Sequence, residues 1–258
     1  MSDALFIAAT GMHAQQTQVD TIANNLANLN TVGFKKSRVS FEPLMPQVVP
    51  ALHGAEAGGA LAYQGMGAAV GGVMPDFIAG EMKPTQRDLD VAINGQGFLE
   101  VEMPDGSHAY TRYGALSVNR DGLLVSANGM PLSAMISLPT DAQSLVIHPD
   151  GRVQMKAPNS DELTDVGVIE LARFVNDRGL KPMGEGLYVA TDESGEATYE
   201  RAGENGAGTL AQAHLEGSNV QMVEELTSLM VAQRAYEANS KVLQAADELA
   251  GLVNNLRR

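Results

Sequence analysis

Two amphipathic segments, one near each end of the chain, constrain the fold more than any other feature. In the first, one line of side chains recurs in alternating steps of three and four residues: Leu5, Ala8, Met12, Gln15, Val19, Ile22, Leu26 and Leu29. This spacing is typical of a helix that packs along other helices. It predicts a helix from Asp3 to Leu29, with Asn28, Asn30 and Gly33 as stop signals.

The second segment repeats this design near the C-terminus. Its line, which Leu249, Leu252 and Leu256 widen, consists of Leu226, Leu229, Gln233, Tyr236, Ser240, Leu243, Ala250 and Val253. We expect a helix from Asn219 to Leu256, with Ser218 and Gln221 as a capping box. Glu224 and Glu225 in the early turns complement the positive end of the helix dipole.

Between the helices, apolar residues alternate with a period of two, and turn signals separate the runs. The turn pairs are Asn94-Gly95, Asp105-Gly106, Asp121-Gly122, Asn128-Gly129 and Asp150-Gly151. Such pairs favour hairpins. Strands are predicted within Phe98 to Met103, Leu123 to Ser126 and Leu145 to His148, and they indicate a mostly antiparallel β domain over 75–208.

The segment before the β domain has a different composition. Prolines at 43, 46 and 50 and a dense Gly/Ala run from Gly54 to Gly72 offer little to bury, so we interpret 34–74 as an extended connector or arm. The predicted fold class is α+β. A discontinuous, coiled-coil-like domain would form from 1–33 and 209–258, with the all-β domain inserted.

Each terminal helix needs a partner for its apolar stripe, because most helical stability comes from burying that stripe. Further copies of the chain are the simplest source of cover. The candidate subunit-packing residues are Leu5, Met12, Val19, Ile22, Leu26, Leu226, Leu229, Tyr236 and Leu243. A closed helix pair within one chain, with the polar seam residues facing water, stays open as an alternative.

Polar residues on or beside the two lines are candidates for setting register. A buried amide penalises every alignment that leaves it unpaired. The candidates are Asn24, Asn25, Gln233, Arg234 and Asn239.

The charge balance argues against two classes of partner. With 17 Lys and Arg against 31 Asp and Glu, the net charge of −14 disfavours nucleic acid and anionic membranes. No apolar run reaches the roughly 20 residues of a membrane-spanning helix. The first residues do not resemble a cleaved secretory signal, so we expect any export to use another route.

No catalytic, cofactor or metal site is expected. The Gly65 to Gly72 run lacks the Lys-Ser or Lys-Thr of a phosphate loop, and the five histidines lack metal-ligand spacing. Asp88 and Asp90 should point together into solvent. The basic group Lys35, Lys36 and Arg38 would either complement the end of the first helix or meet acidic neighbours. A glycan-acting or wall-binding β module is the rival from another class.

Three stretches of the chain carry a family resemblance. The first is LFIAATGM from Leu5, IANNLAN from Ile22 and TVGFK from Thr31; the second is EGSNV from Glu216 and QRAYEANSK from Gln233; the third is LDVAINGQGF from Leu89. Together they closely resemble the flagellar basal-body rod and hook family, over nearly the whole chain. Overall length and the Gly/Ala-rich segment are most similar to its distal-rod members, with proximal rod and hook subunits as alternatives.

The resemblance implies a structural subunit that polymerises into a helical tube, transmits torque and forms the export channel. It implies self-association as a homopolymer and contacts with other rod proteins, the hook and surrounding ring proteins. It also implies type III export without a cleaved signal peptide, to a rod that spans the periplasm. No cofactor is implied.

Overall fold

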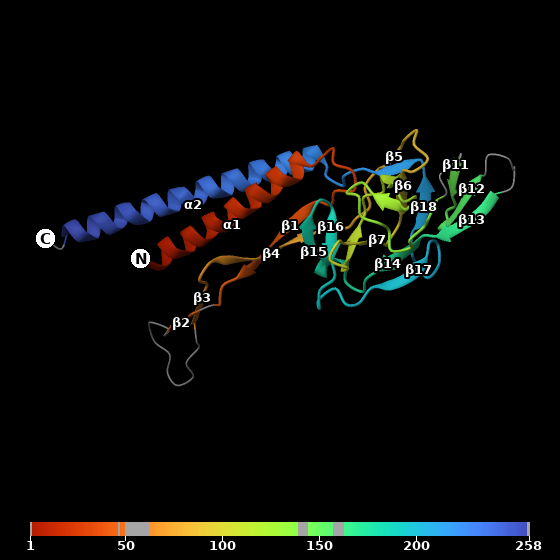
Figure 1. Ribbon diagram of the computed structural model, residues 1–258. Coiled ribbons are helices and arrows are strands. Elements are labelled where there is room, and N and C mark those ends of the chain that lie inside the picture. The colour runs from red at the N-terminus through yellow and green to blue at the C-terminus, as the bar shows by residue number, and fades with distance from the viewer. Residues whose placement is uncertain (1, 46, 50–61, 139–143, 157–162, 257–258) are drawn as a thin grey trace. The chain divides into compact units, whose positions relative to one another are not determined.

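The computed structural model describes residues 2–45, 47–49, 62–138, 144–156 and 163–256 (Figure 1). Pro46, Pro50 and much of the predicted Gly/Ala arm lie outside these residues. The chain divides into two compact units. The helical unit consists of Met1–Ala27, Ser37–Met74 and Gln221–Arg258, and the β unit consists of Asn28–Lys36 and Pro75–Val220.

Both terminal helices are present, which confirms the predicted α+β class. Helix α1 spans Ser2–Ala27 and helix α2 spans Met222–Leu256. The predicted capping box is wrong, because α2 begins after it. The Ser218 hydroxyl accepts from the Val220 N–H at 3.3 Å, and the Asn219 side chain bonds to Lys36 and Asp76. These residues therefore belong to the β unit.

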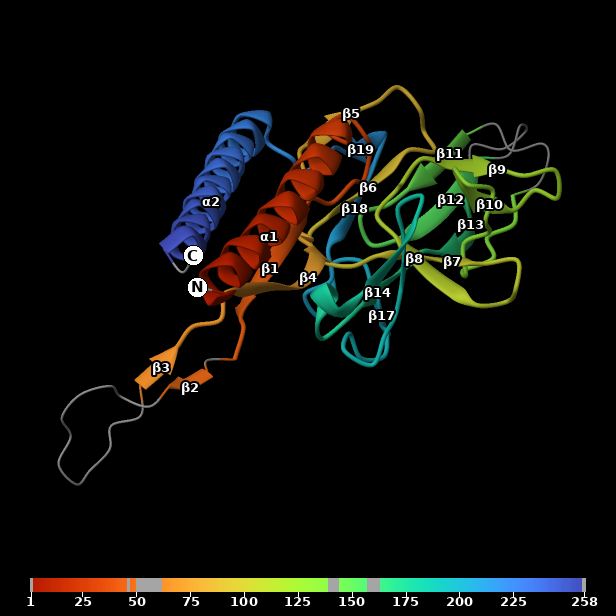
Figure 2. The same ribbon diagram turned by 90° about the vertical axis from the view of Figure 1, so that its left-hand side faces the viewer.

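The two helices run antiparallel along each other (Figures 1 and 2). Asn25 bonds to Glu225, and Gly11 lies against Asn239. The two contacts are 14 residues apart on α1 (11 and 25) and also 14 residues apart on α2 (225 and 239). The two helices therefore have the same register at both contacts.

The described part of the predicted extended connector or arm forms two short ladders. Strand β1 (Ser37–Pro43) pairs with β4 (Ala68–Pro75), and β2 (Gln47–Val49) pairs with β3 (Ala62–Gln64). The Leu44 N–H extends the first ladder by donating to the Gly67 carbonyl at 3.0 Å. Figure 2 shows β1 beside α1.

The β unit has fifteen strands among its described residues. They are β5 (Met82–Pro84), β6 (Val91–Asn94), β7 (Leu99–Glu102), β8 (His108–Thr111), β9 (Leu116–Val118), β10 (Leu124–Ser126), β11 (Ser144–Ile147), β12 (Arg152–Lys156), β13 (Leu163–Val168), β14 (Glu170–Arg173), β15 (Lys181–Gly184), β16 (Leu187–Val189), β17 (Thr198–Arg201), β18 (Thr209–Gln212) and β19 (His214–Glu216). A 3-10 helix, Asp177–Gly179, precedes β15.

The strand pairs of the β unit are antiparallel. The largest sheet has the order β15-β16-β8-β7, a three-stranded sheet has the order β11-β12-β13, and four pairs complete the unit: β10-β9, β14-β17, β18-β6 and β19-β5. Since β18 and β19 pair with β6 and β5, the β unit includes 209–220, which the sequence grouped with the C-terminal helix.

Four of the five predicted turns are confirmed. Hairpins join β7 to β8, β9 to β10 and β11 to β12, and the Asn128-Gly129 turn returns the chain so that Ser126 N–H donates to the Met130 carbonyl. The Asn94-Gly95 hairpin is wrong, because β6 pairs with β18 instead of β7. Gly95 has a φ of 123°, and the turn there leads the chain from β6 to β7, which belong to different sheets.

The core of the β unit combines an aliphatic cluster with an aromatic one. Leu99, Leu124 and Leu171 are central to the first. In the second, Phe98 is fully buried and lies edge-on to Phe77, with ring centroids 5.0 Å apart. Edge-on pairs add about 0.5–1.5 kcal/mol beyond area burial. This core gives the unit a rigid frame for the polar cluster described below.

Candidate assembly surfaces and the buried ion cluster

The predicted packing line of α1 is largely covered by the same chain. Ile22 is buried, as are Ala8 and Ala14. The other predicted packing residues of this helix are half-buried: Leu5, Met12, Val19 and Leu26. Gly67 approaches Thr10 so closely that a Cβ on the glycine would clash with the threonine side chain. The strands of the helical unit therefore cover part of α1.

The packing residues predicted on α2 divide into two groups. Leu229 and Leu243 are half-buried and, with the buried Ala232, form the line that faces α1. Leu226 and Tyr236 are 41% and 40% exposed. The second group is therefore only partly covered in a single chain.

Helix α2 also exposes large apolar residues away from the predicted line. They are Met222, Val223, Met230, Val231, Val242, Leu249 and Leu252. At about 100° per residue, Val231, Val242 and Leu249 share one side of α2, and Leu226 lies on another. Only Leu249 and Leu252 among them were predicted from the sequence, because a single line of side chains does not describe a helix that is apolar in several directions. A plot of all apolar positions around the helix would have shown the rest.

Among the candidate register residues, Asn25 is buried and fully engaged within its own chain. Its Nδ2 donates to the Ser37 carbonyl at 2.9 Å and to Glu225 Oε2 at 3.2 Å, while its Oδ1 accepts from the Ser37 N–H at 2.9 Å. Glu225 is also buried. One amide thus joins α1, β1 and α2.

The other candidate register residues occupy different positions. Asn239 packs against Gly11, where a Cβ added to the glycine would lie 2.9 Å from Asn239 Nδ2. Arg234 is exposed and pairs with Glu237 at 3.0 Å. Asn24 and Gln233 are exposed. The structure therefore brings Asn25 and Asn239 into the contact between the helices, whereas Arg234 pairs along α2.

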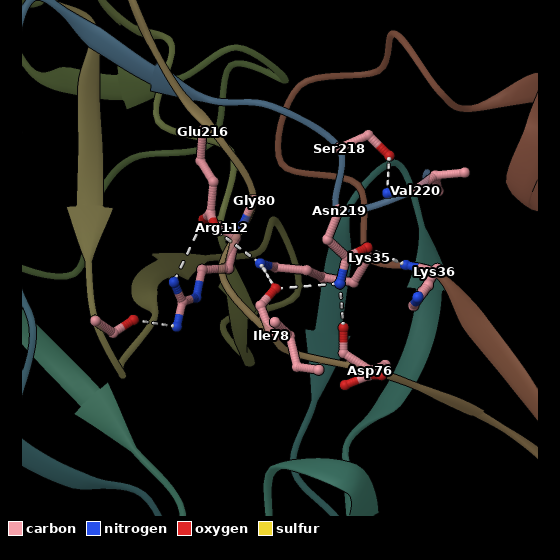
Figure 3. A network of polar contacts seen from close by, with 11 residues as sticks. Lys35, Lys36, Asp76, Ile78, Gly80, Arg112, Glu216, Ser218, Asn219 and Val220 are labelled. Atoms are coloured by element: carbon pink, nitrogen blue, oxygen red, sulfur yellow. Dashed lines mark hydrogen bonds and ion pairs between the residues drawn. The ribbon is translucent and has the colours of Figure 1, made fainter. Parts of the chain in front are cut away.

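The β unit contains a buried ion cluster of Lys35, Arg112 and Glu216 (Figure 3). Lys35 Nζ lies 2.7 Å from Glu216 Oε1, and Arg112 Nη1 lies 3.3 Å from Glu216 Oε2. Lys35 also donates to the Ile78 carbonyl at 2.8 Å, and the Gly80 N–H donates to Glu216 Oε1 at 2.8 Å. Charged groups this deeply buried need such partners.

Hydrogen bonds around the ion cluster join three segments that are distant in sequence: 33–36, 76–80 and 216–219. The Gly33 N–H donates to the Glu216 carbonyl at 2.8 Å. The Lys36 N–H donates to Asn219 Oδ1, and Asn219 Nδ2 donates to the Asp76 carbonyl, each at 2.7 Å. The Asp76 N–H returns a bond to the Lys36 carbonyl at 2.8 Å. Residues on both sides of the arm are therefore direct neighbours.

Electrostatics at the ion cluster reflect burial. Desolvation lowers the pKa of Lys35 below its ordinary value of 10.5, and Glu216 opposes that shift. Burial likewise raises the pKa of Tyr188 to about 12. For the basic group after the first helix, the structure places Lys35 against an acidic neighbour, Glu216. The sequence could not identify the neighbour, because Lys35 and Glu216 are 181 residues apart.

Carboxylates and histidines do not gather into a metal-binding group in the described residues. Asp88 is exposed, but Asp90 is buried, so the expectation that both face solvent is wrong. Asp90 immediately precedes strand β6, and its Oδ1 lies 3.9 Å from Arg87 Nε. His53 lies outside the described residues, and no cluster of three metal-ligating side chains occurs in the rest. Among the described helices, none is long and apolar enough to span a bilayer.

These features define a class: an α+β protein whose terminal helices expose apolar surface. Comparisons with family profiles agree along the chain. Residues 5–35 match the flagella basal body rod protein family, residues 92–155 match the flagellar hook protein FlgE/F/G D1 domain, and residues 211–256 match the C-terminal region of the flagellar basal body rod FlgEFG proteins.

Full-length relatives agree with these matches. The flagellar basal-body rod protein FlgG of Agrobacterium fabrum is 42% identical over 97% of this chain and 98% of its own length. FlgG of Borreliella burgdorferi is 41% identical over the whole of both chains. The chain belongs to the flagellar basal-body rod protein family, and it is a structural protein, not an enzyme. The hook-basal body complex protein FlhP of Bacillus subtilis is 29% identical over both full lengths.

Proposed function

We propose that this chain is a structural subunit of the distal flagellar rod, which polymerises into a helical tube that transmits torque and encloses the export channel. The observation that carries the proposal is the uncovered apolar surface of α2. It includes Leu226, Met230, Val231, Val242 and Leu249, each at least 41% exposed. Exposed apolar surface of this extent marks an interaction site.

The physical driving force is burial of these side chains against neighbouring copies. Fully burying a large apolar side chain is worth about 1.5–3 kcal/mol. Uncovered residues lie on more than one side of α2, so a single pairwise contact would leave part of the helix in water. A closed or helical arrangement, in which each copy has several neighbours, covers them all.

A coiled-coil-like core fits the contact spacing. The Asn25–Glu225 and Gly11–Asn239 contacts are 14 residues apart on each helix, which equals two heptads. In the polymer we expect Leu5, Met12, Val19 and Leu26 to remain on the seam, with Leu226 and Tyr236 packing between subunits. Asn24, Gln233 and Arg234, which are exposed in one chain, remain candidates for register between copies.

Partners and location follow from the family. We expect contacts with other rod proteins and the hook, and with the rings around the rod, in a rod that spans the periplasm. Type III export of the unfolded chain is the expected route. The absence of cysteine supports it, because no disulfide has to form before or after threading.

The test uses Leu226→Asp, since this side chain is exposed in the single chain. We expect the monomer to lose about 1–2 kcal/mol of unfolding free energy and to stay folded, because Leu226 is partly covered in the single chain. We expect no polymer in electron micrographs and no motility in a strain that relies on the variant. Leu229→Asp is less informative because Leu229 packs on α1.

A matched control is Gln244→Asp, which adds the same charge at an exposed polar position of α2. It should assemble normally. Normal polymers from Leu226→Asp would contradict the proposal.

The alternative is a proximal rod or hook subunit. It is supported by the match to a hook-protein domain over residues 92–155 and by the similarity to FlhP. The higher identity to the FlgG relatives favours the rod. Labelled subunits in isolated basal bodies would lie along the distal rod under our proposal, and at the proximal rod or hook under the alternative.

A further inference from the structure

The chain passes between the helical unit and the β unit at four points: 27/28, 36/37, 74/75 and 220/221. The ion cluster and its hydrogen bonds connect 33–36, 76–80 and 216–219, which lie next to three of these points. Force transmitted along the covalent chain across these three points therefore reaches these segments first.

A single ammonium group links all three segments. Lys35 belongs to the first, and its Nζ donates to Ile78 in the second and Glu216 in the third. Glu216 is in turn held by Arg112, whose Nη2 donates to the Gly95 carbonyl at 2.7 Å. Arg112 is also positioned over the Phe98 ring, 5.3 Å from its centroid. The cluster is thus anchored in the aromatic core of the β unit.

Thermodynamic stability is a poor explanation for such a cluster. Replacing buried ions with apolar side chains of similar size is often neutral or stabilising. Charge-assisted hydrogen bonds, however, are short and directional, so displacing the partners breaks them at once. Apolar contacts can instead slide while they stay buried, because they are non-directional.

We propose that Lys35, Arg112 and Glu216 form a mechanical clamp that holds the chain ends of the β unit together under load. The proposed rod function supplies the source of the load, but the clamp itself is a property of the single chain. Lys35 is the central positioning residue because its one ammonium group donates to both of the other two segments. The Glu216 and Asn219 side chains add further bonds among the same segments.

The experiment measures unfolding of the full chain at constant force with two pulling directions. The chain has no cysteine, so introduced pairs give unique attachment points. Asn30→Cys with Gln221→Cys, both at exposed positions, loads the clamp directly. Asp105→Cys with Asp192→Cys, both exposed within the β unit, loads the strands without pulling the clamp segments apart.

In the first direction, Lys35→Met and Glu216→Gln should each unfold at least about tenfold faster than the parent at the same force. A tenfold change corresponds to about 1.4 kcal/mol of barrier height. In the second pulling direction, the unfolding rate of each variant should differ from that of the parent by less than about twofold. Glu216→Gln keeps the shape of the side chain, so it serves where Lys35→Met does not fold, with circular dichroism as the check.

The matched control is Arg152→Met, which removes an exposed ion pair with Asp150. It should leave both rates unchanged. Equal acceleration in both directions would show that the cluster only stabilises the unit, and no acceleration in the first direction would show that it bears no load. Either result overturns the clamp. Loss of polymerisation in the separate assembly test would leave this result unaffected.

Discussion

Gly114 occupies a position where no other residue fits. A Cβ there would clash with the Val91 carbonyl, and the Gly114 carbonyl accepts from the Val91 N–H at 2.9 Å. Gly114→Ala should therefore destabilise the chain by about 1–3 kcal/mol or more, because the clash is with backbone that cannot rotate away. Urea unfolding measures this.

Gly129→Ala provides the comparison. Gly129 has φ 78° but nothing within 4 Å of an added Cβ, so only backbone strain of about 1–2 kcal/mol is expected. An effect of Gly114→Ala no larger than that of Gly129→Ala would contradict the crowding argument.

Lys35 should make stability depend on pH in the alkaline range. Its pKa is lowered by burial in the folded chain, so between that lowered value and 10.5 the unfolded chain binds more protons. Stability attributable to Lys35 therefore rises with pH in this window, by at most about 1.4 kcal/mol per pH unit. Below the window, the cost of burying the charged form is fully present.

The measurement compares the parent with Lys35→Met in urea unfolding between about pH 8 and 10. The parent should gain stability relative to the variant as pH rises. Tyr188, whose raised pKa acts in the opposite direction, is present in both proteins and cancels. A constant or falling difference would contradict the assignment.

At the scale of single residues, the sequence indicated which residues have a structural role better than it indicated which residues they contact. Asn25 was identified as a polar residue beside a seam, and it is buried. Its bonds to Ser37 and Glu225 could not be foreseen, because Glu225 is 200 residues away. Asp90 was misplaced for the same reason: local alternation does not show that a distant part of the chain covers a strand.

At the scale of elements, the contact between α1 and α2 can be tested at Gly11. A glycine inside a helix costs about 0.5–1 kcal/mol relative to alanine. Gly11→Ala alone should gain little or lose stability, since the new Cβ meets Asn239 Nδ2 at 2.9 Å. In an Asn239→Ala background, the same change should stabilise the chain by about 0.5–1 kcal/mol.

A double-mutant cycle followed by thermal unfolding gives the coupling between the two positions. No coupling would mean that the helices do not meet there.

Helices and hairpins could be predicted because the pattern that indicates each of them lies within one short stretch of sequence. Both helices follow from their spacing, and the hairpins at Asp105, Asp121 and Asp150 follow from their turn residues. The β6–β18 and β14–β17 pairs join strands separated by long stretches of chain, so no local pattern indicates them. The Asn94-Gly95 turn was misassigned because a turn dipeptide shows that the chain bends but not which strand lies beside it.

At the scale of the whole molecule, charge should oppose assembly. With a net charge of −14, copies repel one another while α2 attracts them. Raising ionic strength from about 0.02 to 0.5 M shortens the screening length several-fold and should lower the concentration at which the chain polymerises. Sedimentation velocity across this range measures the change.

A non-ionic osmolyte at matched osmolarity controls for general exclusion effects. Polymerisation that weakens as salt rises would instead indicate that ion pairs between copies hold the polymer together.

The bond between the Asp76 N–H and the Lys36 carbonyl has a consequence for variation in length. The chain departs for residues 37–74 and comes back between two adjoining backbone groups, so the β unit already closes without them. Residues added within that excursion, away from the paired strands β1 and β4, lengthen a loop whose ends are fixed, at an entropic cost that grows only slowly with length. Insertions of different lengths can therefore be accommodated at this point while the strands of the β unit keep their pairing.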